Sequence, residues 1–224
     1  MAGSVPTSTV PLPRRPFDSN AAGPPDCPAG PDARARDWYE NDLGWPTVPG
    51  RPLRLVTGLR FDVLDVPAEA GAAALRHLAP GSPVALRGDR MRLLVAAGST
   101  EELPELLDWL EWGPLALDLR ALGADGLMEA PVPPERARGG ARPLLGDRLP
   151  AGPVQGAAVW LRPPGPGGEA EASLPALPAM GGLNGAPDLV RVVDTVAAQC
   201  HRVRLRRASA RPPAFRRNQP LAFS

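Results

Sequence analysis

Proline and glycine limit most strongly what this chain can fold into, because proline interrupts helices and central strands and glycine weakens both. The chain has 31 prolines and 24 glycines among 224 residues, a share that approaches low-complexity composition. Hydrophobic residues still make up 43% of the chain, which is enough to build a core. We therefore expect a folded region where proline and glycine are sparse, flanked by segments that do not fold.

The distribution of these residues predicts three segments. They are a disordered Pro/Gly-rich segment at 1–37, a folded domain at 38–207 and a basic tail at 208–224. Two further Pro/Gly-rich stretches predict loops inside the domain, at 135–156 and 163–183. The domain is expected to end in a helix over 184–207, with Asn184 as its candidate cap.

Short apolar runs between turn residues predict strands, and two stretches have helical spacing. The expected strands are 53–57, 61–66, 83–88, 91–97, 115–120, 127–132 and 157–164. The expected helices are 67–79 and 99–112, the second with a Ser99-x-x-Glu102 capping box and a stripe of Leu103, Leu106, Leu107 and Leu110. This order predicts the α+β class, with a mixed or antiparallel sheet and packed helices.

Positive charge is concentrated at the C-terminal end of the chain. Seven arginines follow Asp194 and no acidic residue does, although the net charge of the whole chain is only +1. Such an end favours an anionic partner, which can be nucleic acid, a membrane surface or an acidic protein. A solvated tail remains the alternative, because the absence of lysine and isoleucine is typical of a GC-rich genome, which itself favours arginine.

Cysteine content and hydropathy bear on the compartment. The two cysteines, Cys27 and Cys200, give no disulfide framework and fit a reducing compartment. The N-terminal stretch lacks the pattern of a signal peptide, and no apolar run reaches the length of a spanning helix. We expect a cytoplasmic protein that does not insert into membranes.

Two aspartates stand within one predicted strand, at Asp62 and Asp65 in "RFDVLDVPAEAG". A buried carboxylate is costly unless it binds a metal, accepts hydrogen bonds or reaches solvent. Residues three apart in an extended strand point to opposite faces, so the two carboxylates cannot serve one site. This strand is therefore either a metal-binding catalytic strand or one that has lost that role.

Six stretches, taken in order, resemble the N-terminal domain of bifunctional DNA primase/polymerases of the archaeo-eukaryotic primase type. They are "LGWPTVP" at 43–49, "VTGLRFDVLDVPAEAG" at 56–71, "RGDRMRLLVAAG" at 87–98, "LALDLR" at 115–120, "GADGLMEAPVPP" at 123–134 and "AAVWLRPP" at 157–164. The resemblance runs from Trp38 to Pro164 and rests on order and spacing. It implies a primase/polymerase-like fold in a stand-alone form without a helicase region.

The resemblance implies nucleotidyl transfer by two Mg²⁺ ions, which an Asp-x-Asp pair and a third carboxylate hold. Asp65 and Asp118 occupy two of these positions, but Pro67 stands where the pair requires its second carboxylate. The histidine that would contact the incoming triphosphate is also missing, since positions 90 to 92 read Arg90, Met91 and Arg92. We therefore interpret the site as degenerate, with Asp65 and Asp118 as its remaining metal-carboxylate positions.

The resulting expectation is a non-catalytic, primase/polymerase-like protein that binds a partner protein or nucleic acid, single-stranded or duplex, in a regulatory role. The residues expected to contact phosphate are Arg90, Arg92, Arg120, Arg204, Arg206 and Arg207. No cofactor is expected, or Mg²⁺ or Mn²⁺ if activity remains. Two alternatives stay open: an active primase/polymerase that recruits Glu69 as a metal ligand, and a protein-binding scaffold without nucleic-acid affinity.

Three local features have simpler structural interpretations. Asp118 and Arg120 fall on one face of a predicted strand, where they form either an intrastrand pair or part of an anion pocket. Trp109 and Trp112 are expected to pack against the sheet. Cys200 is expected to pack in the core, because Cys200 and His201 lack the spacing of a zinc site.

Overall fold

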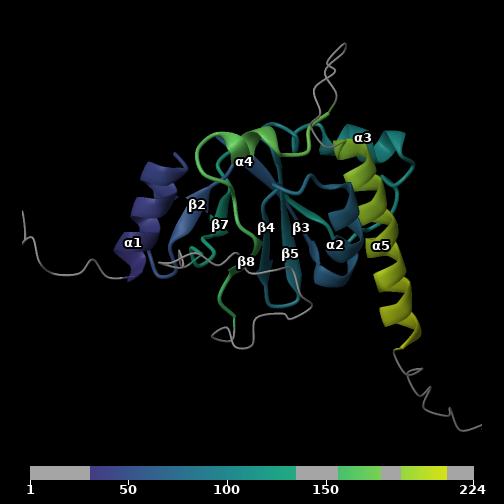
Figure 1. Ribbon diagram of the computed structural model, residues 1–224. Coiled ribbons are helices and arrows are strands. Elements are labelled where there is room, and N and C mark those ends of the chain that lie inside the picture. Colours follow the sequence, from purple (N-terminus) through teal and green to yellow (C-terminus); the bar gives the residue numbers. More distant parts are fainter. Residues whose placement is uncertain (1–30, 135–155, 178–187, 211–224) are drawn as a thin grey trace, which may run out of the picture.

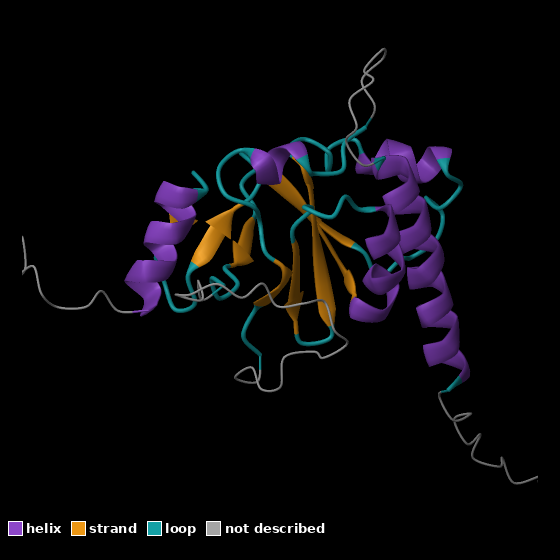
Figure 2. Ribbon diagram, viewed as in Figure 1, coloured by secondary structure: helices purple, strands orange, loops and turns teal. Residues whose placement is uncertain are grey.

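Two antiparallel sheets form the middle of the molecule, with helices on both sides of them (Figure 1; Figure 2). The computed structural model describes residues 31–134, 156–177 and 188–210. The arrangement confirms the predicted α+β class. Every strand pair within the two sheets is antiparallel, so the mixed-sheet alternative does not apply to them.

The sheets have five and three strands. The larger one has the order β6 (Arg120–Leu122), β3 (Phe61–Pro67), β5 (Arg90–Ala96), β4 (Val84–Arg87) and β8 (Val159–Arg162). The smaller one has the order β1 (Thr47–Val48), β2 (Arg54–Val56) and β7 (Leu127–Glu129). Most of the predicted strands are confirmed, and the one predicted at 127–132 lies in the smaller sheet.

Each face of the larger sheet carries its own hydrophobic cluster, because alternate residues of β3 point to opposite sides. Leu64 and Val66 pack with three helices, α2 (Ala68–Ala74), α3 (Leu103–Trp109) and α5 (Leu189–Ser209). Phe61 and Val63 pack on the other face, with the smaller sheet, α4 (Glu169–Ala172) and the π-helix η1 (Trp38–Asp42) that follows α1 (Pro31–Asp37). In Figure 1, α1 and α5 accordingly lie at opposite ends of the molecule.

Strand β3 is the most enclosed element, with all seven residues buried. It ends at Pro67, whose missing N–H cannot continue a ladder but suits the start of α2 at Ala68. The next two strands, β4 and β5, form a hairpin in which Arg87 pairs with Arg90. Gly88 takes a positive φ of 57° in this turn, the conformation that a two-residue hairpin loop requires.

Aromatic side chains connect the residues just after α1 with strand β8. Trp45 lies 4.6 Å from Phe61 and 6.3 Å from Trp160 between ring centroids. The Trp160 indole N–H donates to the Tyr39 hydroxyl (3.0 Å), which donates to the carbonyl of Pro131 (2.6 Å). Burial raises the pKa of Tyr39 well above its usual range, so the phenol stays a donor. The "GWPTVP" and "VWLRPP" stretches therefore meet in one cluster.

The Thr57–Gly58 turn ahead of β3 depends on glycine. Gly58 has φ +89°, and a Cβ there would lie 2.4 Å from the Cα of Ala124. The Thr57 hydroxyl donates to the carbonyl of Gly123 at 2.7 Å. This turn therefore holds the 123–126 loop against the start of β3.

Two predicted elements differ from the structure near α3. The helix predicted at 99–112 begins at Leu103, and Glu102 precedes it without any side-chain capping bond. The predicted capping box does not form, because Glu102 itself takes the cap position and the Ser99 amide donates to the Ala96 carbonyl at 3.1 Å. The predicted leucine stripe is confirmed, since Leu103 and Leu106 are buried and the other two leucines pack against the same cluster.

The strand predicted at 115–120 is wrong except for its last residue. Strand β6 begins at Arg120, and residues before it run beside α5 rather than in the sheet. Their carbonyl groups explain this path: Ala116 accepts from Arg204 at 2.7 Å, and Asp118 accepts from the Cys200 thiol at 3.7 Å. Side chains of α5 thus bind backbone groups that a strand would have used in its ladder.

Segment boundaries also differ. Helix α1 lies inside the segment predicted to be disordered at 1–37, and α4 lies inside the loop predicted at 163–183. Helix α5 begins after Asp188, whose carboxylate accepts from the Val190 amide at 2.9 Å. The predicted cap Asn184, the loop at 135–155 and the tail beyond residue 210 lie outside the described residues. In the described part of the chain, no helix has the length and apolar character needed to cross a membrane.

Candidate functional site

Asp65 lies near the end of β3, on the face that packs toward the smaller sheet. Its neighbours across the two ladders are Arg92 on β5 and Arg120 on β6. Only 12% of its side chain is exposed. A carboxylate this enclosed needs strong partners, and the register places arginine on both sides of it.

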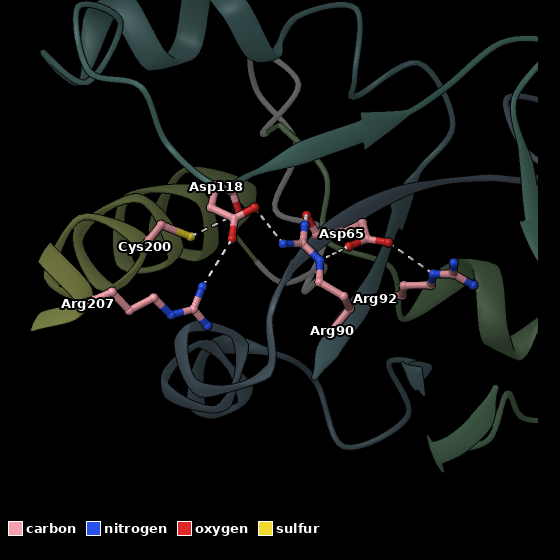
Figure 3. Close-up of polar contacts among 6 residues, drawn as sticks. All are labelled: Asp65, Arg90, Arg92, Asp118, Cys200 and Arg207. Atoms are coloured by element: carbon pink, nitrogen blue, oxygen red, sulfur yellow. Dashed lines mark hydrogen bonds and ion pairs between the residues drawn. The ribbon is translucent and has the colours of Figure 1, made fainter. Parts of the chain in front are cut away.

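Arg90 lies between the two predicted catalytic aspartates and binds both. Its Nε is 2.5 Å from Oδ1 of Asp65, and its Nη1 is 2.6 Å from Oδ1 of Asp118 (Figure 3). Its Nη2 also donates to the backbone carbonyl of Asp65 at 2.7 Å. Arg90 pairs with Pro67 across the β3–β5 ladder, so its side chain starts directly opposite the proline that follows Asp65 by two residues.

Arg92 binds the other oxygen of Asp65. Its Nε lies 3.1 Å from Oδ2, and its Nη1 donates to the backbone carbonyl of Glu129 at 3.4 Å. Only 8% of the Arg92 side chain is exposed. Both oxygens of Asp65 are therefore taken by guanidinium groups, and Arg92 is unavailable to a phosphate from outside.

Asp118 is more exposed and joins the sheet to α5. Its Oδ2 lies 3.7 Å from Nη1 of Arg207, and 42% of its side chain is accessible. The five residues therefore form a continuous chain of alternating charge, which we call the arginine–aspartate relay (Figure 3). It runs in the order Arg92, Asp65, Arg90, Asp118 and Arg207.

Electrostatics keeps the relay charged. Burial by itself lowers the pKa of Arg90, but hydrogen bonds and charge attraction from Asp65 and Asp118 outweigh it, so the pKa is raised above its usual value. Beside the relay, burial and then the charge of Asp118 raise the pKa of the Cys200 thiol to about 11. Arg90 is thus a permanent cation, and Cys200 is a neutral thiol. The predicted packing of Cys200 in the core is confirmed, since it is buried.

The residues at this site do not fit a pair of divalent metal ions. Mg²⁺ requires free carboxylate oxygens, whereas Asp65 offers both of its oxygens to arginine and Pro67 offers none. The guanidinium of Arg90 instead supplies positive charge between the two aspartates. Among the described residues, no group of three or more potential metal ligands comes together.

Glu69, which the active alternative would recruit as a metal ligand, is directed elsewhere. It forms an ion pair with Arg206 of α5, and 56% of its side chain is exposed. Glu69 follows Pro67 in helix α2, and its partner Arg206 belongs to α5. The pair therefore connects two helices at the surface.

The remaining predicted phosphate-binding arginines are exposed, but three have partners within the chain. Arg204 binds the Ala116 carbonyl, Arg206 binds Glu69, and Arg207 binds Asp118. Arg120 is exposed on the edge strand β6, and no ion pair between it and Asp118 is formed. The intrastrand pair is therefore ruled out by the path of residues 115–119.

Two residues of this region escaped the sequence analysis. Glu129 of β7 binds Arg87 of β4 at 2.7 Å and accepts from the Ala158 amide at 3.4 Å. The pair joins the two sheets beside Arg92. The tight turn at Gly88 could have indicated that Arg87 and Arg90 are neighbours, but nothing in the sequence places β7 beside them.

Asp62 is stabilised by neutral hydrogen-bond donors rather than by arginines. Its side chain is fully buried, and its Oδ2 accepts from the Thr100 amide at 3.0 Å and from the Thr100 hydroxyl at 2.8 Å. Its Oδ1 has no hydrogen-bond partner. Asp62 and Asp65 thus serve opposite faces of β3, as the three-residue spacing predicted.

The two tryptophans near α3 correct another expectation. Trp109 is 73% exposed rather than packed against the sheet. Trp112 donates from its indole nitrogen to Asp194 at 2.9 Å and lies 6.2 Å from the His201 ring, both on α5. Only Trp112 therefore contributes to packing.

Comparison with known proteins adds no family assignment: no family model, curated protein or solved structure matches the chain.

Proposed function

We propose that this chain is a non-catalytic, primase/polymerase-like domain that acts by binding a nucleic acid or protein partner. The observation that supports the proposal is the position of Arg90, whose guanidinium binds both Asp65 and Asp118. In an active site of the type that the sequence resembles, these carboxylates would hold Mg²⁺. Here a side chain of the protein itself supplies the cation.

The energetic argument against catalysis follows from burial. To admit a metal ion, Arg90 would have to break its ion pairs with two carboxylates. These ion pairs are largely shielded from water, because only 19% of the Arg90 side chain is exposed. Breaking a buried ion pair costs about 3 kcal/mol, and Mg²⁺ gives up its own water shell reluctantly. The displaced guanidinium would also remain beside the incoming cation. Two metal ions would therefore have to overcome this cost with one carboxylate ligand fewer, because Pro67 has none.

The exposed surface that best suits an anionic partner lies on the C-terminal half of α5. A hollow of about 450 Å³, which we call the α5 groove, is lined by Gln199, Arg202, Leu205 and Arg206. Arg202 is exposed and has no ion pair or side-chain hydrogen bond with a described residue. A cation that is free of internal partners is available to a phosphate group.

Primer extension tests the catalytic half of the proposal. The full chain is incubated with a primed single-stranded template, deoxynucleotides and Mg²⁺ or Mn²⁺, next to the variants Asp65→Ala and Leu59→Ala. No extended primer is expected from any of the three. Template-dependent product that Asp65→Ala abolishes and Leu59→Ala leaves intact would establish an active enzyme and overturn the proposal.

Salt-dependent binding tests the partner. We expect single-stranded DNA to bind with an affinity that falls as salt rises, because each neutralised phosphate releases a counterion. Arg202→Ala should weaken this binding and reduce the salt slope by about one unit. Arg60→Ala is the control: it also removes an exposed arginine, but one that pairs with Glu171 of α4 and does not line the α5 groove, and it should leave binding unchanged. Equal effects of both variants would remove the α5 groove from the proposal.

A scaffold without nucleic-acid affinity is the second candidate. It is favoured by the partners that five of the six arginines predicted to contact phosphate have within the chain. These five are Arg90, Arg92, Arg204, Arg206 and Arg207. The same titration separates the two candidates. If single-stranded and duplex DNA both fail to bind at low salt, we would conclude that the exposed α5 groove binds a protein partner.

A further inference from the structure

The most exposed large apolar side chain among the described residues is Trp109, and it lies on an acidic helix. Its exposed fraction is 73%. Five carboxylates surround it in the sequence, and no basic residue occurs between Arg92 and Arg120. The five are Glu101, Glu102, Glu105, Asp108 and Glu111. Within the part of the chain that the structure describes, none of them forms an ion pair.

These features make one surface on α3. Glu105 and Trp109 are four residues apart and lie on the same side of the helix, and Asp108 is exposed next to them. We call these three residues the Trp109 surface. An exposed tryptophan is typical of interfaces, where it supplies large contact area at low entropic cost. The carboxylates of Glu105 and Asp108 beside it repel a phosphate backbone and favour a basic partner.

The α5 groove has the opposite character. Leu205, which is 53% exposed, lines it together with Arg202 and Arg206. Each surface therefore combines an exposed apolar side chain with charged residues, and these charges have opposite signs on the two surfaces. Helix α3 lies beside the N-terminal half of α5, while the C-terminal end of α5 points away from it (Figure 1). The exposure of Trp109 and Leu205 shows that neither covers the other within one chain.

We infer that the Trp109 surface of one chain docks into the α5 groove of a second copy. The contact is heterologous, because different surfaces of the two copies meet, so each added chain leaves one surface of each kind free. The interface is small, and such contacts are weak and sensitive to salt. Self-association and DNA would then compete for Arg202, the groove arginine that has no ion pair with a described residue.

Sedimentation velocity tests the inference on the full chain, without nucleic acid, at low salt and increasing protein concentration. The sedimentation coefficient should rise with concentration. Trp109→Ala should weaken the association about tenfold, as for an interfacial tryptophan. Leu59→Ala is the matched control, since Leu59 is 66% exposed and belongs to neither surface. A coefficient independent of concentration, or equal effects of the two variants, would overturn the inference.

Charge reversal distinguishes docking from damage to the fold. Glu105→Arg and Arg202→Glu should each reduce association about tenfold when studied alone. An equimolar mixture of the two variants should associate again, because each provides the surface that the other has lost. A mixture that sediments like its separate components would overturn the inference. Since no DNA is present, these results do not depend on whether the chain binds DNA.

Discussion

Two aspartates three residues apart on β3 are both buried, yet they are stabilised in different ways. Asp62, on the helix-covered face, accepts from the amide and hydroxyl of Thr100 and leaves one oxygen without a partner. Asp65, on the opposite face, gives both oxygens to Arg90 and Arg92. The first is held by neutral donors, and the second by cations.

The difference shows what each residue contributes. Asp62 fixes a local turn, since Thr100 lies just before α3. Asp65 begins a relay that reaches α5 through Arg90, Asp118 and Arg207. Burial of a carboxylate therefore does not identify a functional position by itself. The charge of their partners is what distinguishes Asp65 from Asp62.

The largest expected effect is the loss of charge at Asp65. Asp65→Asn leaves Arg90 and Arg92 facing an amide, whose NH₂ group cannot accept their hydrogen bonds. Arg92 would then be a buried cation without a carboxylate partner, while Arg90 would keep only the half-exposed Asp118. The substitution should therefore cost about 3 kcal/mol in the free energy of unfolding, measured by urea denaturation. A loss below about 1 kcal/mol would show that the relay does not stabilise the fold.

The matched substitution Asp62→Asn should cost less, about 1 kcal/mol, because an amide oxygen still accepts from Thr100. The same urea titration provides the comparison. Asp62→Ala should cost more than Asp62→Asn, since it leaves the Thr100 amide without an acceptor. If Asp62→Asn proved as destabilising as Asp65→Asn, the contrast between neutral and charged partners would be wrong.

Asp118→Asn should have a smaller effect still, below about 1 kcal/mol, because its side chain is 42% exposed and solvent screens its ion pairs. The difference from the wild type should shrink further at high salt. If Asp118→Asn lowered the free energy of unfolding as much as Asp65→Asn, Asp118 would contribute as much to stability as the buried Asp65, contrary to this prediction.

Cys200 extends the comparison to a buried group that stays neutral. Its pKa is raised to about 11, so the unfolded thiol loses its proton at a lower pH than the folded one. The Cys200 contribution to stability therefore declines as pH rises from about 9 to 11. In a Cys27→Ser background, the native chain should react slowly with iodoacetamide at pH 8. Fast alkylation of the native chain at that pH would contradict the burial of this thiol.

The sequence predicted most strands of the sheet, because their apolar runs are short and bounded by turn residues. It also predicted that Asp62 and Asp65 face opposite sides, since that follows from strand geometry alone. It missed the path of residues 115–119, because the Arg204 and Cys200 contacts that divert them come from a helix far along the chain. The pattern of apolar and polar residues within 115–120 cannot indicate contacts with a distant helix.

The candidate site was predicted in part. Asp65 and Asp118 do come together, but around Arg90 rather than around an open cleft. Arg90 and Arg92 share a strand face with one another, and this much follows from their spacing. Their meeting with Asp65 depends on the β3–β5 register, which long-range packing sets. The exposure of Trp109 likewise depends on where α3 begins and which of its sides meets the core.

The central claim is that the Arg90 guanidinium takes the place of metal ions between Asp65 and Asp118. Crystals of the full chain soaked in Mn²⁺ test it most directly, because anomalous scattering locates the ion. The account predicts no manganese peak between the two aspartates, with Arg90 still bound to both. Two ordered manganese ions bridged by Asp65 and Asp118, with Arg90 displaced, would contradict it.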